Sequence, residues 1–143
     1  MRILVDADGC PVRKIIVQVA RAAKIPVVMF ADTSHRIEDG YSEVITASKG
    51  KDSVDIVLIN RVEAGDIVVT QDYGVATMAL AKRAIAVSQN GFEYTNENID
   101  RLLFQRYLSQ KVRKSGGKSP KIKKRKTADD HAFRELLLRL VTR

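Results

Sequence analysis

The chain has 143 residues, is 45% hydrophobic and carries a formal net charge of +8, so it can bury one sizeable core but is too short for two ordinary domains. No apolar run approaches the roughly 20 residues of a membrane span, and two aspartates interrupt the N-terminal sequence before it reaches the length of a signal-peptide core, so we expect a cytoplasmic protein without a membrane partner. The single cysteine, Cys10, excludes an internal disulfide and a cysteine-rich zinc site.

The first predicted elements alternate between strands and helices. Short apolar runs and helical periodicity follow each other up to about residue 88, which indicates βα units around a mainly parallel sheet. The predicted strands cover residues 3–5, 27–30, 43–46, 67–70 and 85–88. The predicted helices begin at Pro11, at residue 52 and at residue 74.

The segment 52–62 fits either a buried strand or a buried helix, because its centre is the apolar run Ile56-Val57-Leu58-Ile59. Only four residues separate it from the strand predicted at 67–70. A connection that short cannot join two parallel neighbours, so the segment is predicted to be a helix.

Two helices complete the predicted order. Thr95 offers a capped start to the first, with Ile99, Leu102, Leu103 and Tyr107 available to the core. The second covers residues 128–143, with capping-box spacing from Thr127 to Asp130 and an apolar stripe from Phe133 to Val141. That stripe must pack on its own domain or on a second subunit, which leaves a homo-oligomer open.

The positive charge is concentrated between the last two helices. Nine basic residues and no acid lie between Lys111 and Lys126; removing them from the 25 bases leaves 16, against 17 acids in the whole chain. We therefore expect a basic mobile loop over residues 115–127. It is either a solvated linker or a phosphate-binding strip, for which the candidates are Lys121, Lys123, Lys124 and Arg125.

Aspartates follow the predicted strands. Asp6 and Asp8 come after the first strand, Asp72 comes after the strand 67–70, and Asp52 with Asp55 open the helix between them. The carboxyl ends of parallel strands share one edge of a sheet, where such folds bind ligands. Carboxylates gathered there repel each other unless a cation neutralises them, and oxygen ligands favour Mg²⁺ or Mn²⁺. Such a cation can activate water and stabilise charge on a phosphodiester.

Each of these acids except Asp6 also has a structural interpretation. Asp8-Gly9 suits a turn, as does Asp66, and the spacing of Asp52 and Asp55 suits a helix N-terminus. Asp129 and Asp130 suit the start of the last helix in the same way. Asp6 follows an apolar strand directly and no helix cap requires it, so the pair Asp6 and Asp8 is the strongest signal and Asp72 the next.

Three segments carry a family resemblance. They are Val5-Asp6-Ala7-Asp8-Gly9-Cys10-Pro11, Asp52-Ser53-Val54-Asp55 and Glu63-Ala64-Gly65-Asp66-Ile67-Val68-Val69-Thr70-Gln71-Asp72. With Gly91-Phe92-Glu93-Tyr94-Thr95 and the late Asp129, they extend over nearly the whole chain, which resembles the YaiI/YqxD family of uncharacterised bacterial proteins, grouped with PIN-like domains. The resemblance implies an α/β fold over residues 1–143, a single PIN-like three-layer domain with a mainly parallel central sheet flanked by helices, plus C-terminal helices.

The same resemblance implies a nuclease site. Asp6 would be its first metal ligand, Asp52 or Asp55 the middle one and Asp72 the last, in a Thr-x-Asp signature that begins at Thr70. Asp8 would add a ligand or a supporting contact, and Asp66 and Asp129 are secondary candidates. Typical PIN domains have a glutamate at the middle position, whereas this chain has only aspartates there, which puts a second metal in doubt.

Ser34 and Arg36 follow a strand and are candidates for phosphate contact, although ordinary loop polarity explains them more simply. The hypothesis is a Mg²⁺- or Mn²⁺-dependent nuclease acting on RNA rather than DNA. A haloacid-dehalogenase-type phosphatase, with Asp6 as nucleophile and Asp8 as general acid, is one alternative. A catalytically silent nucleic-acid-binding adaptor that uses the basic loop is another. A reactive Cys10 thiol is a third alternative, and packing before Pro11 explains that residue better.

Overall fold

A computed structural model describes residues 1–32, 36–48, 53–117 and 124–143. It contains one sheet in the order β3-β2-β1-β4-β5, in which every pair of neighbours is parallel. The strands are β1 (Ile3–Asp6), β2 (Val27–Asp32), β3 (Glu43–Ala47), β4 (Ile67–Val69) and β5 (Ile85–Val87). The helices are α1 (Arg13–Ala23), α2 (Val54–Arg61), α3 (Tyr73–Ala81), α4 (Asn96–Lys114) and α5 (Thr127–Val141). The predicted α/β class and mainly parallel sheet are confirmed.

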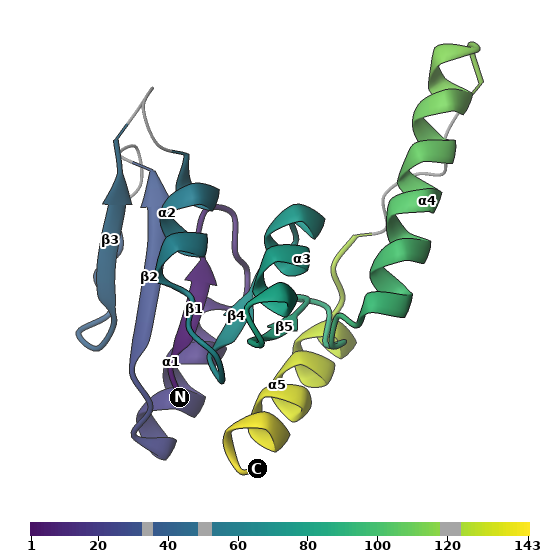
Figure 1. Ribbon diagram of the computed structural model, residues 1–143. Helices are drawn as coiled ribbons and strands as arrows, with labels where there is room; N and C mark the ends of the chain where they lie inside the picture. The colour runs from purple at the N-terminus through teal and green to yellow at the C-terminus, as the bar shows by residue number, and fades with distance from the viewer. Residues whose placement is uncertain (33–35, 49–52, 118–123) are drawn as a thin grey trace.

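Helices cover both faces of the sheet, so the fold has three layers (Figure 1). Alternate residues of each strand point to opposite faces: Ile3 and Val5 join the cluster beneath α1 and α5, while Leu4 joins the cluster beneath α2 and α3. Strands covered on both sides are apolar throughout, which explains the short uninterrupted apolar runs of the sequence. The structure is consistent with a three-layer PIN-like domain.

The last helix packs on its own domain. Phe133, Leu137 and Leu140 of α5 are fully buried in the cluster that α1 also joins. The apolar stripe therefore needs no second subunit to cover it. The start of this helix differs from the prediction by one residue, because Asp129 accepts a hydrogen bond from the backbone N–H of Lys126 (2.8 Å), which makes Lys126 the N-cap.

The order in which the chain adds strands to the sheet reverses at β1. The first three strands run outward on one side in the order β1, β2, β3, and the next two lie on the other side of β1. Val5 of β1 pairs with Val69 of β4, so the carboxyl ends of these two strands are adjacent. In open α/β sheets, ligands bind in the crevice at such a switch point.

The helical interpretation of segment 52–62 is confirmed by α2, but its cap differs from the prediction. Ser53 is the N-cap, and its hydroxyl accepts a hydrogen bond from the backbone N–H of Ile56 (3.4 Å). Asp52, which together with Asp55 was expected at this helix N-terminus, lies outside the described residues. Asp55 falls in the first turn of α2, where its negative charge interacts favourably with the positive end of the helix dipole.

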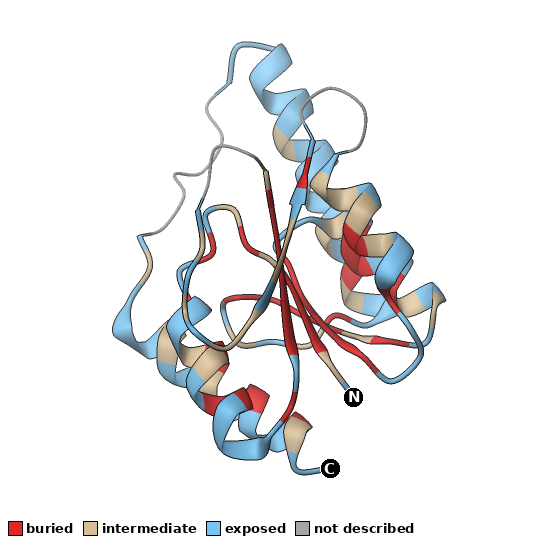
Figure 2. Ribbon diagram, turned by 90° about the vertical axis from the view of Figure 1, so that its left-hand side faces the viewer, coloured by how far each residue is buried: buried red, intermediate tan, exposed pale blue. Residues whose placement is uncertain are grey.

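Two further boundaries differ from the prediction. α1 begins at Arg13 rather than at Pro11, which lies in the preceding turn. α4 begins at its predicted cap, where Thr95 and Asn98 form a capping box, but Leu103 and Tyr107 do not reach the core; they are 41% and 50% exposed. Ile99 in the first turn of α4 is buried, whereas the second half of this helix is almost entirely exposed (Figure 2) and stands to one side of the body (Figure 1).

No helix in the ranges that the structure describes is both long enough and apolar enough to cross a membrane.

Candidate functional site at the carboxyl edge of the sheet

Asp6 and Thr70 form the centre of the candidate site. Asp6 is the last residue of β1, and Thr70 follows β4 directly, so the pairing of the two strands places them side by side. The hydroxyl of Thr70 donates a hydrogen bond to Oδ2 of Asp6 (3.1 Å) and accepts one from the backbone N–H of Asp72 (3.0 Å). Through this buried hydroxyl, Asp6 is tied to the loop that leads into α3.

Other carboxylates surround Asp6. Burial raises the pKa of Asp6 to about 6; the hydrogen bond from Thr70 opposes this rise, and the negative charges of Asp55, Asp72 and Asp8 add to it. Burial also raises the pKa of Asp55, and the charge of Asp72 adds to that rise. Asp55, Asp72 and Asp8 therefore lie near enough to Asp6 for their charges to act on it.

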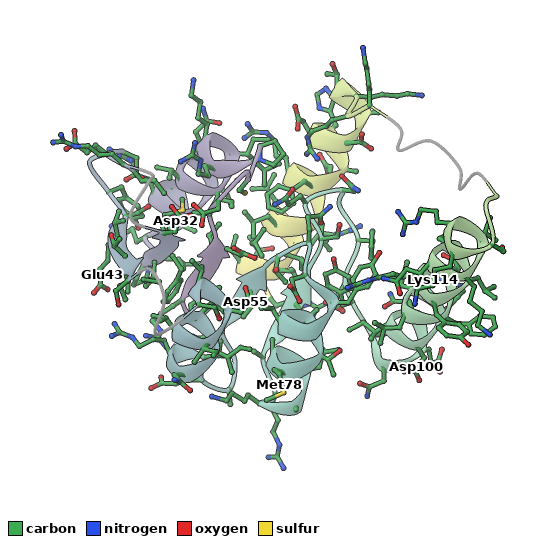
Figure 3. All side chains as sticks on the ribbon, turned by 90° about the horizontal axis from the view of Figure 1, so that it is seen from above. Asp32, Glu43, Asp55, Met78, Asp100 and Lys114 are labelled. Carbon is green, nitrogen blue, oxygen red and sulfur yellow. The ribbon has the colours of Figure 1, made fainter. Side chains whose placement is uncertain are left out.

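Each neighbour of Asp6 is held by the backbone. Asp72 is the N-cap of α3, where Oδ1 accepts a hydrogen bond from the N–H of Val75 (3.0 Å). Oδ2 of Asp8 accepts a hydrogen bond from the N–H of Asp32 at the end of β2 (3.1 Å). Asp55 is placed by the start of α2, and Figure 3 shows it over the middle of the sheet, between α2 and α3.

Behind this edge, a tyrosine supports Thr70. Tyr94 is almost fully buried, and its hydroxyl donates a hydrogen bond to the carbonyl oxygen of Thr70 (3.1 Å). Burial raises the pKa of Tyr94 to about 12, so the phenol keeps its proton and remains a donor throughout the physiological range. Thr70 is thereby fixed from both its backbone and its side chain.

The chemistry of this edge suits a hard divalent cation. All of the candidate donors are carboxylate or hydroxyl oxygens, and a cation between them would compensate the buried charge of Asp6 and the repulsion from its neighbours, which together raise its pKa. Within the described ranges, however, no group of three or more His, Cys, Asp or Glu side chains is already arranged to hold a metal ion. Asp72 is turned toward the N-terminus of its own helix instead. Metal binding by Asp6, Asp55 and Asp72, with Asp52, stays a prediction.

Asp66 does not join this site. It precedes β4, so it lies at the amino edge of the sheet, opposite Asp6. Its carboxylate forms an ion pair with Arg2 (2.8 Å) and accepts a hydrogen bond from the N–H of Glu63 (2.9 Å). The structure gives this secondary candidate a structural role.

Two further candidates hold the start of α5. Arg125 donates hydrogen bonds to the carbonyl oxygen of Gln89 (2.8 Å) and to Asn90 Oδ1 (3.0 Å), and it forms an ion pair with Asp130 (2.8 Å). Its guanidinium is therefore engaged within the chain rather than free for phosphate. Asp129, the other secondary candidate, caps the same helix.

The remaining candidates are less well placed or not described. Arg36 is exposed and pairs with Glu38 (2.6 Å), and Lys124 is exposed. Ser34, Asp52, Lys121 and Lys123 lie outside the described residues. Cys10 is buried, and burial raises the pKa of its thiol, which agrees with packing rather than with a reactive thiolate.

Sequence reasoning overlooked Asp32. This residue ends β2 and meets Asp8 at the same edge of the sheet. The signal was present, because Asp32 follows the apolar run Val27–Ala31 just as Asp6 follows Ile3–Val5. Sequence reasoning also assigned Tyr107 to the core and did not consider Arg106, although both line a cleft that reaches Asp72.

Comparison with known sequences identifies the family. The model of the YaiI/YqxD family, which carries the description "Uncharacterized BCR", matches residues 4–143. This chain belongs to the YaiI/YqxD family. A UPF0178 protein of Ruminiclostridium cellulolyticum is 58% identical over 138 residues, which are 96% of this chain and 90% of that protein. A UPF0178 protein of Natranaerobius thermophilus is 50% identical over 141 residues, which are 99% of this chain and 96% of that protein. No solved structure matches the chain significantly.

The family match covers Asp6, Asp8, Asp55 and Asp72 together, from the first strand to the last helix. The predicted membership of the YaiI/YqxD family is confirmed. The family description names no reaction.

Proposed function

We propose that this protein hydrolyses phosphodiester bonds, in RNA in preference to DNA, with Mg²⁺ or Mn²⁺ bound by Asp6, Asp55 and Asp72, and with Asp52 and Asp8 as further ligands or supports. One observation carries the proposal: at the switch point of the sheet, Asp6 is largely buried beside three other aspartates, and its burial, together with their charges, raises its pKa to about 6. Among the described residues no base forms an ion pair with Asp6 to offset this charge. The preference for RNA comes from the resemblance to PIN-like nucleases.

In this proposal some residues bind the metal ion and others orient the residues that bind it. Asp6 is largely ionised at neutral pH, since its pKa is about 6, and Thr70 fixes the direction of its Oδ2. Asp8 is held by the N–H of Asp32, so one of its oxygens has a fixed place beside Asp6. A bound divalent cation would activate water and stabilise negative charge on the phosphate.

Metal binding is the first test. Manganese titration by calorimetry near neutral pH should show that Asp6→Asn weakens Mn²⁺ affinity by about tenfold or more, because a charged oxygen ligand is lost. Asp100→Asn is the matched control, since Asp100 is an exposed aspartate on α4 away from the sheet edge, labelled in Figure 3. Equal Mn²⁺ affinity in wild type and Asp6→Asn would rule out the proposed site.

Proton competition gives a second signature. The pKa of Asp6 lies near 6 in the folded protein, so protonation of this carboxyl competes with the metal as the pH falls through that value. We expect Mn²⁺ affinity to be constant above about pH 7 and to fall by up to about tenfold for each pH unit below 6. The Asp6→Asn variant should lose that dependence, and an unchanged profile would contradict the assignment.

Cleavage is the third test. Wild type and Asp6→Asn are incubated with labelled single-stranded RNA, structured RNA and DNA in Mg²⁺ or Mn²⁺, with p-nitrophenyl phosphate as a parallel substrate. The proposal expects RNA cleavage that Asp6→Asn abolishes. Turnover of p-nitrophenyl phosphate without RNA cleavage would favour the phosphatase alternative. Salt-sensitive RNA binding without cleavage, equal in both proteins, would favour the adaptor.

A further inference from the structure

A cleft lies between the acidic edge of the sheet and α4. It has a volume of about 420 Å³, within the range of small-molecule sites, and Asp72 stands at one wall. Its other lining residues are Gly74 of α3 and Leu103, Arg106, Tyr107 and Gln110 of α4. The cleft therefore continues directly from the candidate metal site onto the exposed side of a helix.

The half of α4 that forms this wall is both aromatic and basic. Phe104 and Tyr107 are 59% and 50% exposed, and their rings stack with centroids 6.5 Å apart. Nζ of Lys111 lies 5.2 Å from the centroid of the Tyr107 ring. Residues 101–114 contain five bases and no acid. In Figures 1 and 3 this part of α4 stands to one side of the body.

Arg106 is available for a ligand. It is exposed, lines the cleft, and within the described residues it forms neither a hydrogen bond nor an ion pair. A guanidinium in this position matches the two oxygens of a phosphate, and an exposed tyrosine ring beside it matches the face of a base. Alternating cations and aromatic rings are the usual surface for single-stranded nucleic acids.

We propose that this cleft binds one strand of nucleic acid, with Arg106 on a backbone phosphate and Tyr107 stacked on an unpaired base, as the strand passes from Asp72 along α4. The proposal rests on the proposed function and narrows its substrate to single-stranded segments. A base inside a duplex is already stacked on both faces, so it offers no face to Tyr107 without being unstacked.

The charge on α4 favours a nucleic acid over a second copy of this chain. Leu103, Phe104, Tyr107, Leu108 and Val112 are exposed apolar residues that a dimer could also cover. In a two-fold dimer the same surface meets itself, so the five bases of residues 101–114 would face five identical charges. A strand of nucleic acid in the cleft instead brings phosphates of opposite charge to Arg106, while basic residues that do not line the cleft, such as Arg113, make no direct contact with it.

The test measures equilibrium binding of a labelled single-stranded RNA of about ten nucleotides by fluorescence anisotropy. The buffer contains EDTA, so that no metal-dependent cleavage occurs during the measurement. Arg106→Gln and Tyr107→Ala should each raise the Kd by about tenfold. Arg113→Gln and Leu108→Ala are the matched controls on the same helix, because neither residue lines the cleft, and both should stay near the wild-type Kd. All four side chains are exposed, and circular dichroism checks that the variants fold.

Salt dependence separates the two roles. Arg106→Gln should reduce the slope of log Kd against log salt by about one, because one phosphate contact is lost, whereas Tyr107→Ala should leave the slope unchanged. A duplex of the same sequence should bind more weakly, and Tyr107→Ala should leave its Kd unchanged.

Three results would overturn the assignment: no effect of Arg106→Gln and Tyr107→Ala, equal effects of the controls, or a dimer in sedimentation that Leu108→Ala dissociates. If the protein hydrolyses RNA but Arg106→Gln and Tyr107→Ala leave the Kd for RNA unchanged, this inference is wrong and the proposed function is retained. If both variants weaken RNA binding but the protein hydrolyses no RNA with Mg²⁺ or Mn²⁺, the cleft is confirmed as a binding site and the proposed function is wrong.

Discussion

Asp6 and Asp66 adjoin neighbouring strands at opposite edges of one sheet, and they differ in what surrounds their charge. Asp66 faces Arg2, whose guanidinium reaches both of its oxygens (2.8 and 3.4 Å). Asp6 faces a threonine and three aspartates, and burial together with the charges of these aspartates raises its pKa to about 6. Where a carboxylate serves the fold, the chain supplies a cation. At the switch point it supplies more carboxylates, an arrangement typical of a functional site.

Removing the cation from the amino edge should have the largest effect on stability. Arg2→Met keeps much of the apolar stem but leaves Asp66, whose side chain is 5% exposed, as an uncompensated buried charge. We expect a loss of about 2 to 3 kcal/mol in the free energy of unfolding, measured with urea. The double variant Arg2→Met/Asp66→Asn should recover part of this loss, because the charge is then gone. A double variant no more stable than the single one would show that packing, not charge, is responsible.

Removing the charge at the carboxyl edge should have the opposite sign. The pKa of Asp6 is higher in the folded chain (about 6) than the ordinary value of 3.8, so the ionised form weakens the fold. That penalty is complete above about pH 6 and fades as the pH falls toward 3.8. Asp6→Asn should therefore stabilise the protein by about 1 to 2 kcal/mol near pH 8, after allowance for solvent around a partly buried side chain.

The gain from Asp6→Asn should shrink on acidification and vanish near pH 4. Urea unfolding of both proteins across this range measures it, and Asp100→Asn, at an exposed site, should change stability by less than about 0.5 kcal/mol at every pH. Destabilisation by Asp6→Asn at high pH would mean that Asp6 serves the fold as Asp66 does.

The contrast between the two edges was only partly visible in the sequence. Strand ends are local features, so Asp6, Asp8 and Asp72 could be assigned to one edge once the strands were predicted to be parallel. Asp66 sits at the start of its strand and not at the end, yet the sequence analysis kept it as a secondary site candidate. Its partner Arg2 is 64 positions away, and no local pattern reveals such a pairing. Asp32 was detectable by the rule that found Asp6, and was missed because its strand was predicted to end at residue 30.

The fold was more predictable than the surfaces. Periodicity located each strand and helix, and the short connection to β4 decided the nature of α2. Periodicity also showed apolar residues along α4, but it cannot say what covers them, since that depends on where the helix lies relative to the sheet. Leu103 and Tyr107 were assigned to the core for that reason, and they line a cleft instead.

The smallest expected effect concerns Thr70, the uncharged hydrogen-bond partner of Asp6. The hydrogen bond from its hydroxyl holds the pKa of Asp6 below the value that burial and the other aspartates would give. Thr70→Val removes this donor with little change in shape, so the pKa of Asp6 should rise further above 6, while Thr70→Ser should retain the wild-type value because it keeps the hydroxyl. Carboxyl-detected NMR titration of Asp6 measures both. Equal pKa values in the two variants would show that the hydroxyl of Thr70 only caps the N–H of Asp72 and leaves the charge at the switch point untouched.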